Sequence, residues 1–132
     1  MRRLIAPVTL CLAVWIAPTA SAETTVLPEQ QGPAGVVFAD DPAIVDAHRM
    51  PAESFSRVAG DHAIAVRFTT GTPECYGVHA TVAETAQTVD VELLSGSLPE
   101  AAGRACIMIA VSGTVEVPLQ SPLGERQVRS VS

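Results

Sequence analysis

Four runs in the second half of the chain alternate apolar and polar residues, and this alternation constrains the fold more than any other feature. The runs cover residues 62–69, 78–84, 88–94 and 114–119. In the third run, Val89, Val91 and Leu93 fall on one side of an extended chain, and the residues between them are polar. A period of two is typical of strands with one buried and one exposed face. We therefore expect at least four half-buried strands.

Two more runs complete the expected sheet. Residues 105–111 are apolar on both faces, which predicts a central strand, and residues 126–131 are short and mostly polar, which suits an edge strand. Glycine, proline and serine cluster between the runs, as in turns. No helical period competes with this pattern. The expected fold is all-β, a small antiparallel β-sandwich (Ig-like or a partly open barrel) of five to seven strands at residues 61–132.

Residues 23–60 carry a proline about every nine residues and lack the alternation. Because proline cannot donate a backbone hydrogen bond, we expect a disordered tail at residues 23–35 and an extended arm at residues 36–60. Residues 36–38 and Phe55 are the expected anchors of this arm. A short helical turn is expected at residues 42–47, where an aspartate precedes a proline.

The N-terminus has the three parts of a secretory signal. Arg2 and Arg3 precede an apolar run at residues 4–17, and Ala20-Ser21-Ala22 is a small-residue cleavage site. The apolar run is shorter than the roughly 20 residues that a membrane-spanning helix needs. A retained membrane anchor is the alternative. Cys11 lies inside the apolar run rather than after it, so a lipid-anchored cysteine is not expected. We predict that residues 1–22 are a signal peptide.

Cleavage after Ala22 leaves fourteen acidic residues and six arginines, a net charge of −8. A strongly acidic chain without basic clusters repels phosphate backbones and anionic lipid surfaces. Nucleic-acid binding is therefore not expected. A stable membrane span after cleavage is not expected either, because no stretch beyond residue 22 is long and apolar enough. The chain has no lysine and is rich in alanine and valine, which suggests a GC-rich, actinobacterial genome.

Two cysteines, Cys75 and Cys106, remain after cleavage. An even number of cysteines in an exported chain predicts a disulfide. A metal site that uses Cys75 with His79, and a redox-active pair, are the alternatives. Redox pairs usually have the Cys-x-x-Cys spacing, which is absent here.

The histidines are the first place to look for chemistry. His48 follows Asp40, Asp41 and Asp46, but the spacing matches no calcium-binding loop, so we expect a solvated acidic segment. His62 is expected at a turn.

His79 lies in a predicted hairpin. A turn near residues 85–86 would place His79 opposite Glu92 and Thr81 opposite Asp90, all on the polar face. The functional interpretation is an acid–base pair or half of a metal site, and the structural interpretation is an exposed cross-strand pair. We expect no metal site and keep His79 and Glu92 as the only candidate ligands.

Nucleophilic catalysis has little support in the sequence. No serine lies in a Gly-x-Ser-x-Gly turn. Cys75 and His79 could form a thiol–imidazole couple, but the expected disulfide to Cys106 consumes the thiol. No glycine-rich phosphate loop is present, and no cofactor is expected.

Five short motifs follow one another along the second half of the chain: VRFTTG at 66–71, CYGV at 75–78, TVAET at 81–85, ACIMIA at 105–110 and PLGERQV at 122–128. In these motifs the chain resembles a group of small exported actinobacterial proteins of uncharacterised function, and the resemblance covers about half of the chain. The resemblance implies a β domain held by its two cysteines and implies no activity.

These features predict an exported, non-enzymatic protein that binds or scaffolds at the cell envelope or outside the cell. An envelope or extracellular protein partner would contact the edge strand and the proline-rich arm. The alternative is a small metal-binding protein or a hydrolase that uses His79 and nearby carboxylates.

Overall fold

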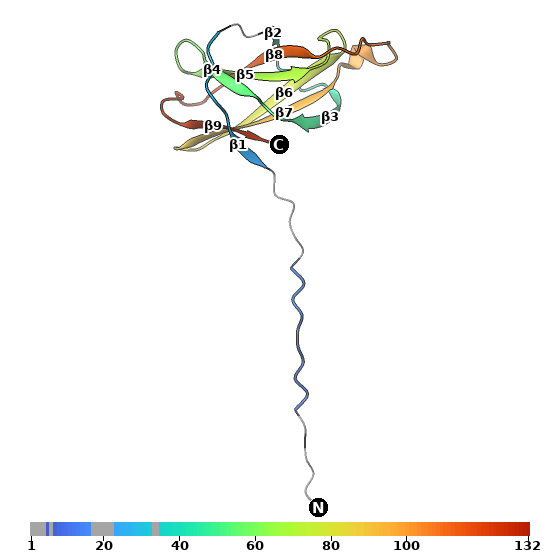
Figure 1. Cartoon of the computed structure of the whole chain (residues 1–132), viewed down its shortest axis with the longest axis vertical. Helices are drawn as coiled ribbons and strands as arrows, with labels where there is room; N and C mark the ends of the chain where they lie inside the picture. Colours follow the sequence, from blue (N-terminus) through green and yellow to red (C-terminus); the bar gives the residue numbers. More distant parts are fainter. Residues whose placement is uncertain (1–4, 6, 17–22, 33–34) are drawn as a thin grey trace, which may run out of the picture.

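The computed structural model describes residues 5, 7–16, 23–32 and 35–132, and its strands form two packed sheets (Figure 1). The first sheet contains β1 (Thr24–Val26), β3 (Val45–Met50), β6 (Tyr76–Glu84), β7 (Thr88–Ser97) and β9 (Gln127–Val131). The second sheet contains β2 (Val36–Phe38), β4 (Ser54–Arg57), β5 (Ala63–Thr70) and β8 (Val111–Pro118). A short 3-10 turn, η1 (Pro99–Ala101), follows β7.

Strand β7 is the centre of the first sheet. On one edge, β7 pairs with β6 along nearly its whole length. On its other edge, the first half of β7 pairs with β9 and the second half pairs with β3. The second sheet has the order β2-β8-β5-β4. Most neighbours are antiparallel, whereas β2 with β8 and β7 with β9 are parallel.

The core lies between the sheets, and the predicted alternating positions supply much of it. Every second residue of β5 and β7 is buried, including Ile64, Phe68 and Val91. The Phe38 and Phe68 rings pack edge to face, with centroids 5.3 Å apart. Burial of one face drives the alternation. The predicted all-β sandwich is confirmed.

The predicted central strand at residues 105–111 is wrong. Only Val111 belongs to a strand, where it pairs with Thr70 at the start of β8. Residues 107–109 are exposed outside both sheets. An apolar run has the same appearance in sequence whether or not another strand is available to pair with it. Here Cys106 ties the segment to the end of the sandwich instead.

The strand predicted at residues 126–131 forms as β9, but its predicted position at the edge of the sheet is wrong. Strand β9 pairs with β1 on one side and β7 on the other, so it lies inside the sheet. Val128 and Ser130 are buried, and the Ser130 hydroxyl accepts a hydrogen bond from the backbone of Ala52. Polar composition misled the prediction, because Arg129 faces outward while its neighbours face the core.

The predicted disordered tail at residues 23–35 contains ordered structure. Strand β1 pairs with β9, Leu27 is buried, and the Gln30 amide donates to the Phe55 carbonyl. Pro28 lacks an amide hydrogen but accepts a hydrogen bond from Phe55 through its carbonyl. Residues 33 and 34 lie outside the described residues.

The predicted arm at residues 36–60 consists of strands of both sheets, so the sandwich begins before residue 61. Phe38 and Phe55 are buried as expected, but Val37 is 74% exposed. No helical turn forms at residues 42–47. The Asp41 carboxylate accepts a hydrogen bond from the Ala43 amide, and the chain then enters β3, because β7 offers it a free edge.

Candidate functional site

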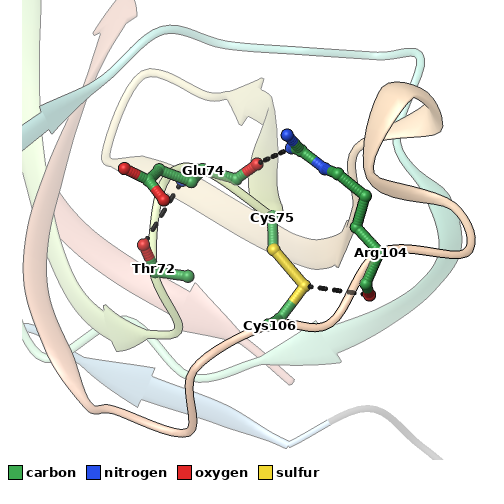
Figure 2. Close-up of a disulfide and its surroundings, with 5 residues drawn as sticks. All are labelled: Thr72, Glu74, Cys75, Arg104 and Cys106. Atoms are coloured by element: carbon green, nitrogen blue, oxygen red, sulfur yellow. Dashed lines mark hydrogen bonds between the residues drawn. A yellow bond between two sulfur atoms is a disulfide. The ribbon is translucent and has the colours of Figure 1, made fainter.

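The predicted disulfide is confirmed, and it joins the start of β6 to an irregular segment (Figure 2). The Cα atoms of Cys75 and Cys106 are 6.2 Å apart. Cys75 is buried, and Cys106 is half-buried. The Arg104 guanidinium donates a 2.9 Å hydrogen bond to the Glu74 carbonyl beside the bridge. This end of the sandwich is therefore fixed at two adjacent points.

Residues 105–110, which we call the strap, run from this bridge to the start of β8. Within the described part of the chain, residues 105–109 form no backbone–backbone hydrogen bond. Ile107, Met108 and Ile109 are 61%, 94% and 48% exposed. Large apolar side chains gathered on a surface are typical of interaction sites. The strap is the most exposed apolar segment of the sandwich itself.

A cleft of about 500 Å³ lies next to the strap. The strap forms one wall, and Met50 and Tyr76 from the first sheet contribute apolar surface. The Thr70 and Ser95 hydroxyls, 3.0 Å apart, are hydrogen-bonded to each other in the cleft. His48 also lines the cleft. Apolar walls with a few polar groups are typical of binding clefts.

The predicted contact of His79 with Glu92 does not form. In the β6–β7 hairpin, His79 lies opposite Leu94 and Thr81 lies opposite Glu92, a register two residues away from the prediction. The turn is centred one residue later than expected, on Ala86 and Gln87. Because the side-chain period of a strand is two, the slip leaves His79 on the outer face as predicted.

His79 and Glu92 each contact a different partner. The His79 Nδ1 atom lies 2.9 Å from the Asp40 carboxylate, which also accepts a 2.7 Å hydrogen bond from the Ala80 amide. Glu92 forms a 3.1 Å ion pair with Arg49 of β3. These contacts join neighbouring segments. The structure therefore places the two candidate metal ligands, His79 and Glu92, in separate side-chain pairs.

The other acidic candidates are dispersed in the same way. Asp90 forms two hydrogen bonds with Arg129, of 2.6 and 2.8 Å, and these bonds raise the pKa of Arg129. His48 and the aspartates before it do not form a shared site, because Asp40 contacts His79 and His48 lines the cleft. Over the described residues, no three His, Cys, Asp or Glu side chains gather into a group suited to a metal ion.

His62 follows Asp61, which occupies a left-handed backbone conformation with φ of 59°. The Asp61 carboxylate accepts a 2.9 Å hydrogen bond from the Gly124 amide, which lowers the pKa of Asp61. Its other oxygen accepts from Arg57. Asparagine and aspartate tolerate this conformation better than most residues. The contacts fix the loop between β4 and β5 against the loop before β9.

Sequence reasoning missed the most enclosed ion pair, between Glu84 and Arg126. Their side chains are 3.1 Å apart and only 13% and 11% exposed. The Glu84 carboxylate also accepts hydrogen bonds from the amides of Gln120 and Ser121. The Gln120 amide contributes most to lowering the pKa of Glu84, and Arg126 also lowers it. Only the fold brings these distant residues together.

Among the residues that the structure describes, no helix is long and apolar enough to cross a membrane. Comparisons with protein families, with curated proteins and with solved structures find no significant match to this chain.

Proposed function

We propose that this chain is an exported, non-enzymatic binding module that acts at the cell envelope or outside the cell, with the strap and its cleft as the binding surface. The observation that carries the proposal is the place where the sandwich begins. Glu23, the first residue after the predicted cleavage site, donates a backbone hydrogen bond to Ser132, and β1 begins at Thr24. Removal of residues 1–22 would leave every described strand intact.

The apolar run near the N-terminus supports the same proposal. In its described part, side chains such as Leu12 and Trp15 are 81% and 93% exposed, and the segment extends away from the sheets (Figure 1). Apolar residues that pack on nothing contribute no core energy to the domain. An apolar segment of this kind suits a secretory signal peptide, which is removed from the mature protein. The Cys75–Cys106 disulfide suits an oxidising compartment.

A binding role agrees with the state of the side chains that catalysis or metal binding would need, because these side chains are already engaged in contacts within the fold. Glu92 and Asp90 each form an ion pair that joins two segments, His79 contacts the Asp40 carboxylate, and Cys75 is consumed by the disulfide. The strap offers a partner a surface of exposed apolar side chains.

Expression of the full chain in a bacterial host that exports proteins tests the export step. We expect the protein outside the cytoplasm, whereas a Leu12→Arg variant should remain in the cytoplasm as a longer precursor, because a charge interrupts the apolar run. Glu116→Arg, on the exposed face of β8, is the matched control and should be exported normally. Cytoplasmic retention of the unaltered chain would contradict the proposal.

A further inference from the structure

The strap has a nearly symmetric sequence centred on Met108. Ile107 and Ile109 flank the methionine, and the small side chains of Cys106 and Ala110 follow on either side. In an antiparallel contact between two straps, Met108 lies on the two-fold axis and Ile107 of one copy faces Ile109 of the other. Contacts between identical subunits are usually of this self-complementary type. Two copies of the strap in antiparallel orientation therefore bring apolar residues opposite apolar residues.

Charge points to the same partner. The chain carries no charged residue from Ala105 to Val115, although the exported form has a net charge of −8. Two copies that meet at the strap bring no like charges together at the centre of the contact. A strongly charged partner would find no complementary group in this stretch.

The backbone of the strap is also free to pair. Residues 105–109 make no backbone–backbone hydrogen bond among the described residues. An extended segment of this kind can accept a second strand, with the backbone providing hydrogen bonds and the side chains providing apolar contact. The disulfide at Cys106 and the start of β8 at Val111 hold both ends of the strap, so pairing requires little reorganisation.

We propose that the strap is a self-association surface, through which two copies of this chain form a two-fold dimer by antiparallel pairing centred on Met108. This inference names the partner at the proposed binding surface, and it rests on the proposed binding role and not on export. Because each copy is acidic, long-range repulsion opposes the dimer, and salt should strengthen it.

Sedimentation equilibrium of residues 23–132, with the disulfide formed, tests the proposal. These residues hold every described strand, and circular dichroism checks the fold first. We expect a monomer–dimer equilibrium that strengthens when NaCl rises from about 0.05 M to about 0.5 M. Met108→Asp places two carboxylates at the axis and should weaken dimerisation at least about tenfold. The side chain of Met108 is almost fully exposed, so the variant should fold.

Val37→Asp is the matched control, because Val37 is an exposed apolar residue on β2, outside the strap, and its charge should leave dimerisation unchanged. Three results would each overturn the proposal. These are a monomer at every concentration up to about 1 mM, a dimer that Met108→Asp leaves intact, and a dimer that Val37→Asp weakens equally. Binding of an apolar dye or an extended peptide by a chain that stays monomeric would assign the strap to another partner.

A pair of double variants tests the register. Ile107→Arg with Ile109→Asp places opposite charges across the two-fold axis and should retain the dimer. Ile107→Asp with Ile109→Asp places like charges there and should lose it. Equal dimerisation by both double variants would exclude antiparallel pairing centred on Met108.

Discussion

Arg126 is the residue that fastens the end of the β6–β7 hairpin to the loop before β9. Its guanidinium donates to the carbonyls of Thr85, Ser121 and Pro122 and to the Glu84 carboxylate. Arginine suits this role because its planar donors reach several acceptors at fixed angles. Loss of either partner would leave charged or polar groups without their hydrogen bonds in a partly enclosed site.

Glu84→Gln removes the charge that pairs with Arg126, and we expect it to lower the free energy of unfolding at pH 7 by about 1–2 kcal/mol. The pKa of Glu84 is lowered by folding, so its contribution is complete above the ordinary value of 4.5 and is lost as pH falls through the lower folded value. The gap between variant and parent should therefore narrow below pH 4.5.

Urea unfolding at a series of pH values measures this gap. Glu116→Gln is the control, because Glu116 is an exposed carboxylate on β8, and this variant should match the parent throughout. A gap for Glu84→Gln that stays constant from neutral to acidic pH would show that the carboxylate charge does not contribute.

At the scale of elements, Gly113 of β8 allows two aromatic rings to cover the strand. A Cβ atom at this position would lie 2.6 Å from a Phe38 ring carbon and 2.7 Å from a Phe68 ring carbon. Both rings are buried, so they have little room to move. The glycine is therefore a packing requirement of the core.

We predict that Gly113→Ala lowers the free energy of unfolding by about 1–3 kcal/mol, because the added methyl group overpacks the core. Ser112→Ala, at the exposed neighbouring position, should change it by less than about 0.5 kcal/mol. Equilibrium denaturation of both variants gives the comparison. Equal stability of Gly113→Ala and the parent would mean that the Phe38 and Phe68 rings can shift without cost.

The strap depends on its disulfide more than on hydrogen bonds. The Cys75–Cys106 bridge closes a loop with a sequence separation of 31 residues, which contains β6 and β7. We predict that the double variant Cys75→Ser and Cys106→Ser keeps the β fold but loses about 3–4 kcal/mol of stability in the chain-entropy model.

Limited trypsin digestion gives a local measure of the same change. Without the bridge, cleavage after Arg104 should become faster than cleavage after Arg129, whose side chain pairs with Asp90 in the sheet. A strap that resists trypsin equally in both forms would show that its side-chain contacts, and not the bridge, hold it.

The alternation of apolar residues predicted β5, β6, β7 and β8 because each of these strands has one face on the core and one in solvent. It did not predict β1 to β4, which are short, lie among prolines and gain their stability from edges that distant strands offer. At the strap, the apolar residues wrongly predicted a central strand, because sequence alone does not show whether a neighbouring strand is available to pair.

The candidate site was predicted only in part. The disulfide followed from the even number of cysteines in a chain predicted to be exported. The exposure of Ile107 to Ile109 did not, because apolar residues are usually buried. Glu84 and Arg126 are 42 residues apart in the sequence, and no local pattern predicts their contact.

At the scale of the whole molecule, the two ends of the sandwich differ in structure. One end carries the disulfide, the strap and the cleft, and the other carries the Glu84–Arg126 contact. Strand β1, which follows the predicted cleavage site, pairs with β9, so a chain that begins at Glu23 would start beside the final strand (Figure 1). Loss of residues 1–22 would therefore leave the strap and its cleft unchanged.

The most direct test of an exported sandwich is intact-mass and N-terminal sequencing of the protein recovered outside the cytoplasm. We predict a chain that begins at Glu23, with Cys75 and Cys106 joined and no free thiol. Recovery of a chain that keeps residues 1–22, or of one in which Cys75 and Cys106 are free thiols, would contradict the proposed export and its disulfide-fixed binding surface.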